Sequence, residues 1–230
     1  MIHPLLFIAR RSHLALPPQA PARWLPLVLG LLGCFAMASQ ALAEGNSRSS
    51  FPGRRVGGGT RGECTARLVA NLVPKSDVYA PGASGLIGIL QGPSANLHPL
   101  IVAFKSANAA GVVEPGASVL ASREIAAAPV GLVLLKAPSL RGATQWETSY
   151  RCEGGSADPD PLSFVSAGAP PAVSLLVPST EPVDRLFQAE LLQLKAHCGG
   201  TIAREQIAKV FALEELLASD WPAQLPVRCL

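Results

Sequence analysis

The chain has 230 residues, of which 49% are hydrophobic and 15% are charged. Because an average globular protein carries about 25% charged residues, a chain too polar to fold is excluded for most of this length. The formal net charge is +3, but removal of Arg10, Arg11 and Arg23 with an export segment would leave 16 basic and 16 acidic residues. This balance gives no support to nucleic acid as a partner or to broad attraction by an anionic membrane.

Residues 1–43 have the organisation of a secretory signal peptide. Arginines without any acidic residue precede an apolar run over 24–37, and a small-residue A-x-A site follows at 41–43. The run is short for a membrane-spanning helix, so we expect no transmembrane segment in the mature chain. The sequence therefore predicts export to the periplasm or the medium, with a mature chain that begins at Glu44. Two alternatives stay open, a twin-arginine signal and a lipobox that would leave Cys34 acylated and the protein lipid-anchored.

A glycine-rich leader and a series of short strands follow. Residues 44–62 hold many Gly, Ser and Arg and few large apolar side chains, which indicates a flexible leader. The run 64–73 alternates with period two, which is typical of a half-buried strand. Apolar runs bounded by Gly, Pro, Asn or Ser predict further strands over 86–90, 100–105, 117–121, 130–135 and 173–177.

The clearest strand lies over 144–152. On this strand one face carries Thr144, Trp146, Thr148, Tyr150 and Cys152, opposite a face of polar and charged side chains. Such strict alternation predicts one face packed on the core and one face in water.

The pattern changes from strands to helices after Pro182. Apolar positions over 183–194 follow helical spacing, and Gly199-Gly200 supplies a stop. Thr201 is a candidate N-cap for a second helix. The apolar residues assigned to that helix are Ile207, Val210, Phe211, Leu213, Leu216 and Leu217. We therefore expect residues 181–230 to form a helical hairpin annex.

Four cysteines remain once Cys34 is removed with the signal peptide: Cys64, Cys152, Cys198 and Cys229. An even count in an exported chain indicates disulfides, and none of the spacings is of the zinc type. A Cys198–Cys229 bond would close the hairpin and a Cys64–Cys152 bond would join two strands. This local pairing is preferred, while the crossed pairings stay open.

Several stretches of the chain resemble a known family. They are an arginine and glycine stretch over 53–64, an apolar run after a proline at 98–104, a glycine-led run at 131–135, and the strand ending in Cys152. Over about 53–180 they resemble a cyanobacterial family of exported proteins known as domain of unknown function 928. The resemblance implies an exported β protein and supplies no established activity. The Ala-rich loops and the C-terminal hairpin depart from the family pattern.

Tyr150, two residues before Cys152, also resembles the tyrosine corner of immunoglobulin-like domains. We therefore predict a mainly β fold, an immunoglobulin-like antiparallel β-sandwich over 63–180 with the helical hairpin over 181–230.

The sharpest candidate binding feature is a cluster of leader arginines. Arg54, Arg55 and Arg61, with Arg48 and Arg67 nearby, could hold phosphate, sulfate or carboxylate groups on a glycine-rich segment. A solvated linker with arginines for solubility is the competing interpretation. The ligands and partners that fit this cluster in an exported protein are an acidic polysaccharide, a lipid headgroup, or an envelope or surface protein with an acidic surface.

No catalytic constellation is visible in the sequence. Only His98 and His197 remain after signal removal, and the 82–85 tetrapeptide Gly-Ala-Ser-Gly is one residue short of the esterase nucleophile elbow. We expect no catalytic residue, no metal and no cofactor, and predict an exported, disulfide-stapled, non-enzymatic binding or envelope-associated module. One alternative is a hydrolase of envelope or extracellular polymers that uses acids such as Glu147 or Glu153 in a cleft. Another is a lipid-anchored accessory protein of a secretion or surface-assembly system.

Overall fold

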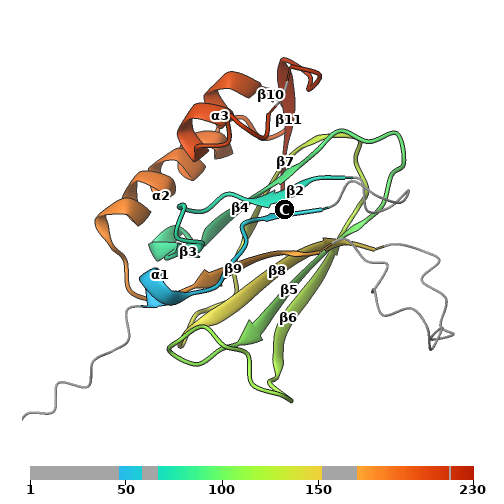
Figure 1. The fold of residues 1–230 in the computed structure, drawn as a ribbon. Coiled ribbons are helices and arrows are strands. Elements are labelled where there is room, and N and C mark those ends of the chain that lie inside the picture. The colour runs from blue at the N-terminus through green and yellow to red at the C-terminus, as the bar shows by residue number, and fades with distance from the viewer. Residues whose placement is uncertain (1–46, 59–66, 152–169, 218) are drawn as a thin grey trace, which may run out of the picture. The chain divides into compact units, whose positions relative to one another are not determined.

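The computed structural model describes residues 47–58, 67–151, 170–217 and 219–230. Over these residues the chain forms two β-sheets and two helices of eight residues or more (Figure 1). The strand order is β1-β2-β4-β7-β11-β10 in the first sheet and β3-β9-β8-β5-β6 in the second. The prediction of a mainly β fold built from two sheets is confirmed.

The elements have the following bounds. The first sheet consists of β1 (Val56–Gly57), β2 (Val69–Asn71), β4 (Leu86–Gln91), β7 (Gly131–Lys136), β10 (Thr201–Ala203) and β11 (Gln224–Cys229). The second sheet consists of β3 (Val78–Tyr79), β5 (Leu100–Ser106), β6 (Val119–Ile125), β8 (Thr144–Tyr150) and β9 (Ala172–Leu176). The helices are α1 (Ser47–Ser50), the 3₁₀ turn η1 (Gly82–Ser84), α2 (Pro182–Lys195) and α3 (Arg204–Phe211).

Both sheets are mixed, which corrects the expectation of purely antiparallel pairing. Strand β11 pairs with β7 in parallel, and β3 pairs with β9 in parallel, whereas the other strand pairs are antiparallel. Parallel neighbours need a crossover connection rather than a tight turn. For β7 and β11 the connection contains the whole segment from β8 to α3, so local sequence patterns carry no signal for this pair.

The first sheet is covered on both faces. Its central strands β4 and β7 are buried at every position but Lys136, as expected for strands with no face in water. Helix α2 lies on one face (Figure 1), so close that a Cβ on Gly88 would press against Leu72, Leu134 and Leu191. The expected half-buried strand over 64–73 is therefore wrong where it is described, since β2 is buried throughout.

The second sheet packs on the other face of the first sheet. Its strand β8 alternates between buried and half-buried residues as the sequence predicts, with Trp146 and Thr148 directed into the core. A small polar network bridges the sheets, because Asn71 donates to Ser174 Oγ at 3.1 Å and accepts from Thr148 Oγ1 at 2.8 Å. Buried polar groups satisfied in this way fix the register of one sheet against the other.

The C-terminal segment differs from a separate helical annex. It contains two helices, and Phe187 of α2 meets Phe211 of α3 edge to face at 5.5 Å. Helix α3 ends at Phe211, so Leu213, Leu216 and Leu217, which the sequence pattern assigns to the second helix, lie beyond it. However, Thr201 lies in strand β10, and α3 begins at Arg204 with Ala203 as its N-cap. Strand β11 joins the first sheet beside β7, so the segment completes the main sheet rather than adding a domain.

A disulfide joins Cys198 and Cys229, with their Cα atoms 5.6 Å apart, as the preferred local pairing predicts. It fixes the turn after α2 to the end of β11. The predicted Cys64–Cys152 bond, the signal peptide over 1–43 and the lipobox at Cys34 lie outside the described residues. No described helix has the length and apolar character required to cross a membrane.

The leader is built into the fold over residues 47–58, which we call the N-terminal strap. Its strand β1 pairs with β2 of the first sheet, while Arg54 exchanges two backbone hydrogen bonds with Val173 of β9, at 2.8 and 2.7 Å. The strap therefore bonds to both sheets. Gly57 is required at this point, because a Cβ there would collide with the backbone of Pro171 and Ala172. This ordered part of the leader differs from the flexible linker that its composition predicted.

Candidate functional site

The leader arginines predicted to bind anions lie in different surroundings. The Arg55 guanidinium caps the end of α3, where it donates to the carbonyl oxygens of Phe211 at 2.9 Å and Ala212 at 2.8 Å, and it also donates to Val73 O at 3.2 Å. The carbonyls of Phe211 and Ala212 lie at the end of α3, where helix carbonyls lack a partner inside the helix and a cation is favoured by the helix dipole. Burial lowers the pKa of Arg55, although the charges of Asp77 and Glu214 oppose this effect.

Arg54 has an exposed side chain, with one long hydrogen bond of 3.4 Å to Pro171 O. Arg61 lies outside the described residues. The described part of the cluster is thus one arginine engaged as a helix cap and one exposed arginine, and not two guanidinium groups converging on one ligand.

Arg48 fixes the strap to helix α2. Its guanidinium forms ion pairs with Asp184 at 2.6 Å and with Glu181 at 2.8 Å. Asp184 is fully buried and also accepts hydrogen bonds from the backbone N–H groups of Ala80 and Glu181. Removing one partner of such a buried pair is costly, so the role of Arg48 is structural.

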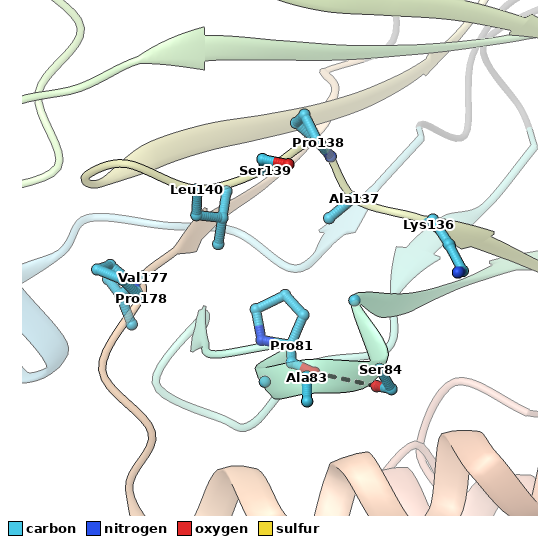
Figure 2. Close-up of a pocket in the computed structure, with 12 residues that line it drawn as sticks. Pro81, Ala83, Ser84, Lys136, Ala137, Pro138, Ser139, Leu140, Val177 and Pro178 are labelled. Carbon is cyan, nitrogen blue, oxygen red and sulfur yellow. Dashed lines mark hydrogen bonds between the residues drawn. The ribbon is translucent and has the colours of Figure 1, made fainter.

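A cavity of about 340 Å³ opens at one end of the sandwich. Figure 2 shows its walls, which come from three loops far apart in the sequence: the η1 turn, the loop after β7, and the start of the connection from β9 to α2. Its lining residues are Pro81, Gly82, Ala83, Ser84, Gly85, Lys136, Ala137, Pro138, Ser139, Leu140, Val177 and Pro178. A volume of this size lies at the lower end of the range of small-molecule sites.

The wall formed by η1 is held rigidly. Ser84 Oγ donates to Pro81 O at 3.0 Å and accepts from the Leu86 N–H at 3.2 Å. Gly85 ends the turn with a φ of 62°, and its carbonyl oxygen accepts from the Ala137 N–H at 2.9 Å. The η1 wall is therefore bonded directly to the wall that follows β7, which preforms the cavity.

The chemistry of the lining favours binding over proton transfer. Three prolines with Leu140 and Val177 form apolar surface, and Lys136 contributes a cation. The lining residues include no carboxylate, imidazole or thiol. The Gly-Ala-Ser-Gly tetrapeptide that falls one residue short of a nucleophile elbow does line the cavity, but the Ser84 hydroxyl is bonded to its own turn. A serine nucleophile needs a base within hydrogen-bond reach. Among the lining residues Lys136 is the side chain that could act as one, but the hydrogen bonds of the Ser84 hydroxyl are made to Pro81 and Leu86 and not to Lys136.

The acids named for a hydrolase do not reach this cavity. Glu147 lies on the outer face of the second sheet, bonded to Lys105 at 2.6 Å and to Gln145 at 2.7 Å. Glu153 lies outside the described residues. Burial raises the pKa of Asp77, but that carboxylate accepts a hydrogen bond from the Arg55 N–H in the strap and is not a lining residue. In the described ranges no three of the residues His, Cys, Asp and Glu gather as a metal site would require.

Comparisons with protein-family models, with curated proteins and with solved structures gave no match. The fold and the cavity together define a disulfide-bonded protein of two mixed β-sheets with a preformed small-molecule-sized cavity. Sequence reasoning missed this site, apart from the 82–85 tetrapeptide, because its walls are brought together by the long-range pairing of β4 with β7 and of β3 with β9.

Proposed function

We propose that this chain is an exported, disulfide-stapled, non-enzymatic binding module. The observation that carries the proposal is the cavity in Figure 2, whose walls combine apolar side chains with polar groups and a lysine, and whose lining residues include no carboxylate, imidazole or thiol. A hydrolase of polymers would need two carboxylates in a cleft, or a nucleophile with its base. A preformed cavity that combines apolar side chains with polar groups able to orient a ligand is instead a usual form of a binding site.

The proposed ligand has a small apolar body and an anionic end. Proline rings and the Leu140 and Val177 side chains offer surface to the apolar part. Lys136 and the Ser139 hydroxyl stand at the same cavity and suit a carboxylate, sulfonate or phosphate group. An anionic ligand of this kind replaces the polyanion that the leader arginines suggested for the same exported protein.

Export is part of this proposal. The Cys198–Cys229 bond supports an oxidising compartment, because disulfides persist in exported proteins and are rare in the cytosol. Cleavage after Ala43 would release the mature chain into the periplasm or the medium, with an envelope or surface protein as a further partner. Acylation at Cys34 would instead anchor the same module to a membrane. The resemblance to domain of unknown function 928 is in keeping with either location.

The proposal is tested with an anionic naphthalene dye, 8-anilinonaphthalene-1-sulfonate, which combines an apolar body with a sulfonate. We expect saturable binding of one dye per chain, with enhanced fluorescence. Ser139→Trp places an indole at the cavity and should weaken binding at least tenfold, whereas Lys136→Gln should weaken it about threefold, as expected for one exposed charge. The matched control is Ser118→Trp, since Ser118 is exposed and is not a lining residue. Equal binding by both tryptophan variants would reject the cavity as the site.

The hydrolase alternative makes a different prediction. The folded protein would release soluble products from envelope or extracellular polymers, and a Glu147→Gln variant would lose that release while keeping its fold. Product release from a panel of such polymers, measured with the Glu147→Gln variant beside the unmodified chain, separates the two functions. Release that depends on Glu147 would replace the binding module by an enzyme.

A further inference from the structure

A second polar site lies at the other end of the first sheet, away from the cavity. The cavity is lined by Lys136, which pairs with Leu86 at the start of β4, whereas this site surrounds Gln91 at the end of β4. Gln91 of β4 and Arg228 of β11 lie on the face of the first sheet that is directed toward the second sheet. Arg67 precedes β2 at the same end of the first sheet. We call these three side chains the basic end cluster.

Arg67 is buried, with 2% of its surface exposed, yet it is only partly bonded. Its Nε donates to Gly92 O at 2.8 Å, its Nη2 donates to Ala128 O, and the guanidinium lies 4.8 Å from the centre of the Tyr150 ring. Its Nη1 is buried without a hydrogen-bond partner. A buried guanidinium nitrogen without an acceptor is costly and marks a place where an acceptor is missing.

Arg228 and Gln91 supply two further donors. Arg228 is partly exposed, and it donates to Ala126 O at 3.0 Å and to Gln91 Oε1 at 2.8 Å. With its oxygen engaged in this way, the Gln91 side chain directs its amide nitrogen elsewhere, and that nitrogen is buried without a partner. The same end of the sandwich holds His98, two residues before β5, whose Nε2 is a third buried atom without a partner.

Among the described residues, the two positive charges of the basic end cluster have no counter-ion. In the part of the chain that the structure describes, neither Arg67 nor Arg228 forms an ion pair with a carboxylate. Burial lowers the pKa of both arginines, and the charge of Arg228 lowers the pKa of Arg67 further, which places the two guanidinium groups within electrostatic reach. Carbonyl oxygens and an aromatic ring offset part of the cost of burying these charges, and an anion would offset the rest.

We propose that the basic end cluster binds a small oxyanion, a phosphate or sulfate group. The free Nη1 of Arg67, just before β2, and the free Nε2 of Gln91, at the end of β4, offer donors from two segments, and the partly exposed Arg228 offers the route of entry. Donors that arrive from several directions suit a tetrahedral oxyanion, and guanidinium groups are the usual residues for such recognition. The group could be free in solution or the substituent of a larger acidic polymer.

The inference is independent of the proposed cavity function, because the two sites share no lining residue. The probes are inorganic phosphate and inorganic sulfate, added to the oxidised full chain and followed by calorimetric titration. We expect saturable binding of one ion per chain. Arg228→Gln should weaken it at least tenfold, since hydrogen bonds to charged groups are among the strongest. Arg185→Gln, which changes an exposed arginine of α2, should leave it unchanged.

Further experiments identify the source of the oxyanion and distinguish loss of the site from misfolding of a variant. Binding of dextran sulfate is compared with binding of uncharged dextran, to test whether the oxyanion is carried by a polymer. If the free ions do not bind, dextran sulfate should bind, and the Arg228→Gln variant should weaken that binding. Arg67→Lys keeps the charge but removes the planar fork, and it should also lose affinity, while Ser139→Trp at the cavity should not. If neither the ions nor the sulfated polymer bind, or if Arg185→Gln weakens binding as much as Arg228→Gln, the inference is overturned.

Discussion

Removing the Cys198–Cys229 bond tests how the C-terminal segment is held in the fold. The bond closes a loop over a sequence separation of 31 residues, which contains β10, α3 and β11. In the loop-entropy description a loop of this length contributes about 3.6 kcal/mol to the free energy of unfolding. For a protein of this size such a loss lowers the melting temperature by about 7 to 14 °C. We therefore expect the double variant Cys198→Ser with Cys229→Ser to fold with this reduced stability.

The assay is urea unfolding followed by tryptophan fluorescence, which reports on the core because Trp146 and Trp221 are both buried. The double variant leaves no unpaired thiol at this site. Its urea midpoint should fall, and the dependence of free energy on urea should rise, because the unfolded chain without the cross-link exposes more surface. Reductant should destabilise the unmodified chain at least as much, and any additional loss would report the predicted Cys64–Cys152 bond. A loss below about 1 kcal/mol would refute the reasoning, because β11 would then be held without the disulfide.

Three further variants test the strap and the turn that supports it. Arg55→Ala strips the cap from the end of α3 and should cost about 2–4 kcal/mol in urea unfolding, whereas exposed Arg54→Ala should cost under about 1 kcal/mol. Asp77 has a φ of 59°, which Asn tolerates as Asp does, so Asp77→Asn keeps the backbone of the turn. Burial raises the pKa of Asp77 above 3.8, so ionisation of this carboxyl lowers the stability of the fold as pH rises through the folded-state pKa. Asp77→Asn should remove this loss and stabilise the protein at pH 7, as melting temperatures measured across pH 4–8 will show. Gly57→Ala should prevent the strap from pairing, seen as faster hydrogen exchange in β1, while Gly142→Ala, with open space around it, should not.

The strands with strict alternation could be predicted from the sequence. The predicted strand over 144–152 corresponds to β8, with Trp146 and Tyr150 on the buried face, and the apolar runs at 86–90 and 130–135 correspond to β4 and β7. These strands could be predicted because their apolar residues either alternate with period two or form a continuous run, and either pattern can be recognised within the sequence of a single strand. Strand β6 begins at Val119 and continues to Ile125, beyond the predicted 117–121, because an exposed edge strand tolerates charged residues.

The C-terminal strands could not be predicted in the same way. Strand β11 contains Pro226, which is unusual within a sheet, and its buried and exposed residues alternate over only six positions. Its partner β7 lies about 90 residues earlier in the chain. Similarly, the composition of the strap indicates a linker. Tertiary contacts turn it into structure, through the side chains of Arg48 and Arg55 and through backbone pairing with β2 and β9. Glycine in the strap is needed for close approach at Gly57 rather than for flexibility.

The candidate sites depend on long-range pairing, so little of them was visible beforehand. Arg67 belonged to the arginine cluster noted in the sequence, but its partner Arg228 is 161 positions later and reaches it only through β11. The cavity walls contain prolines and small residues that are common in any loop. Residue type alone therefore does not reveal the cavity, whereas the pairing of β4 with β7 and of β3 with β9 brings its walls together.

Native mass spectrometry of the protein purified from its own host, without reductant, tests the central claim of a binding module most directly. We predict that the unmodified chain, beginning at Glu44, carries a bound small molecule, and that Ser139→Trp loses this molecule while keeping its fold. Spectra that show the bare chain for the unmodified protein, or the same bound molecule on both proteins, would contradict the cavity as the functional site.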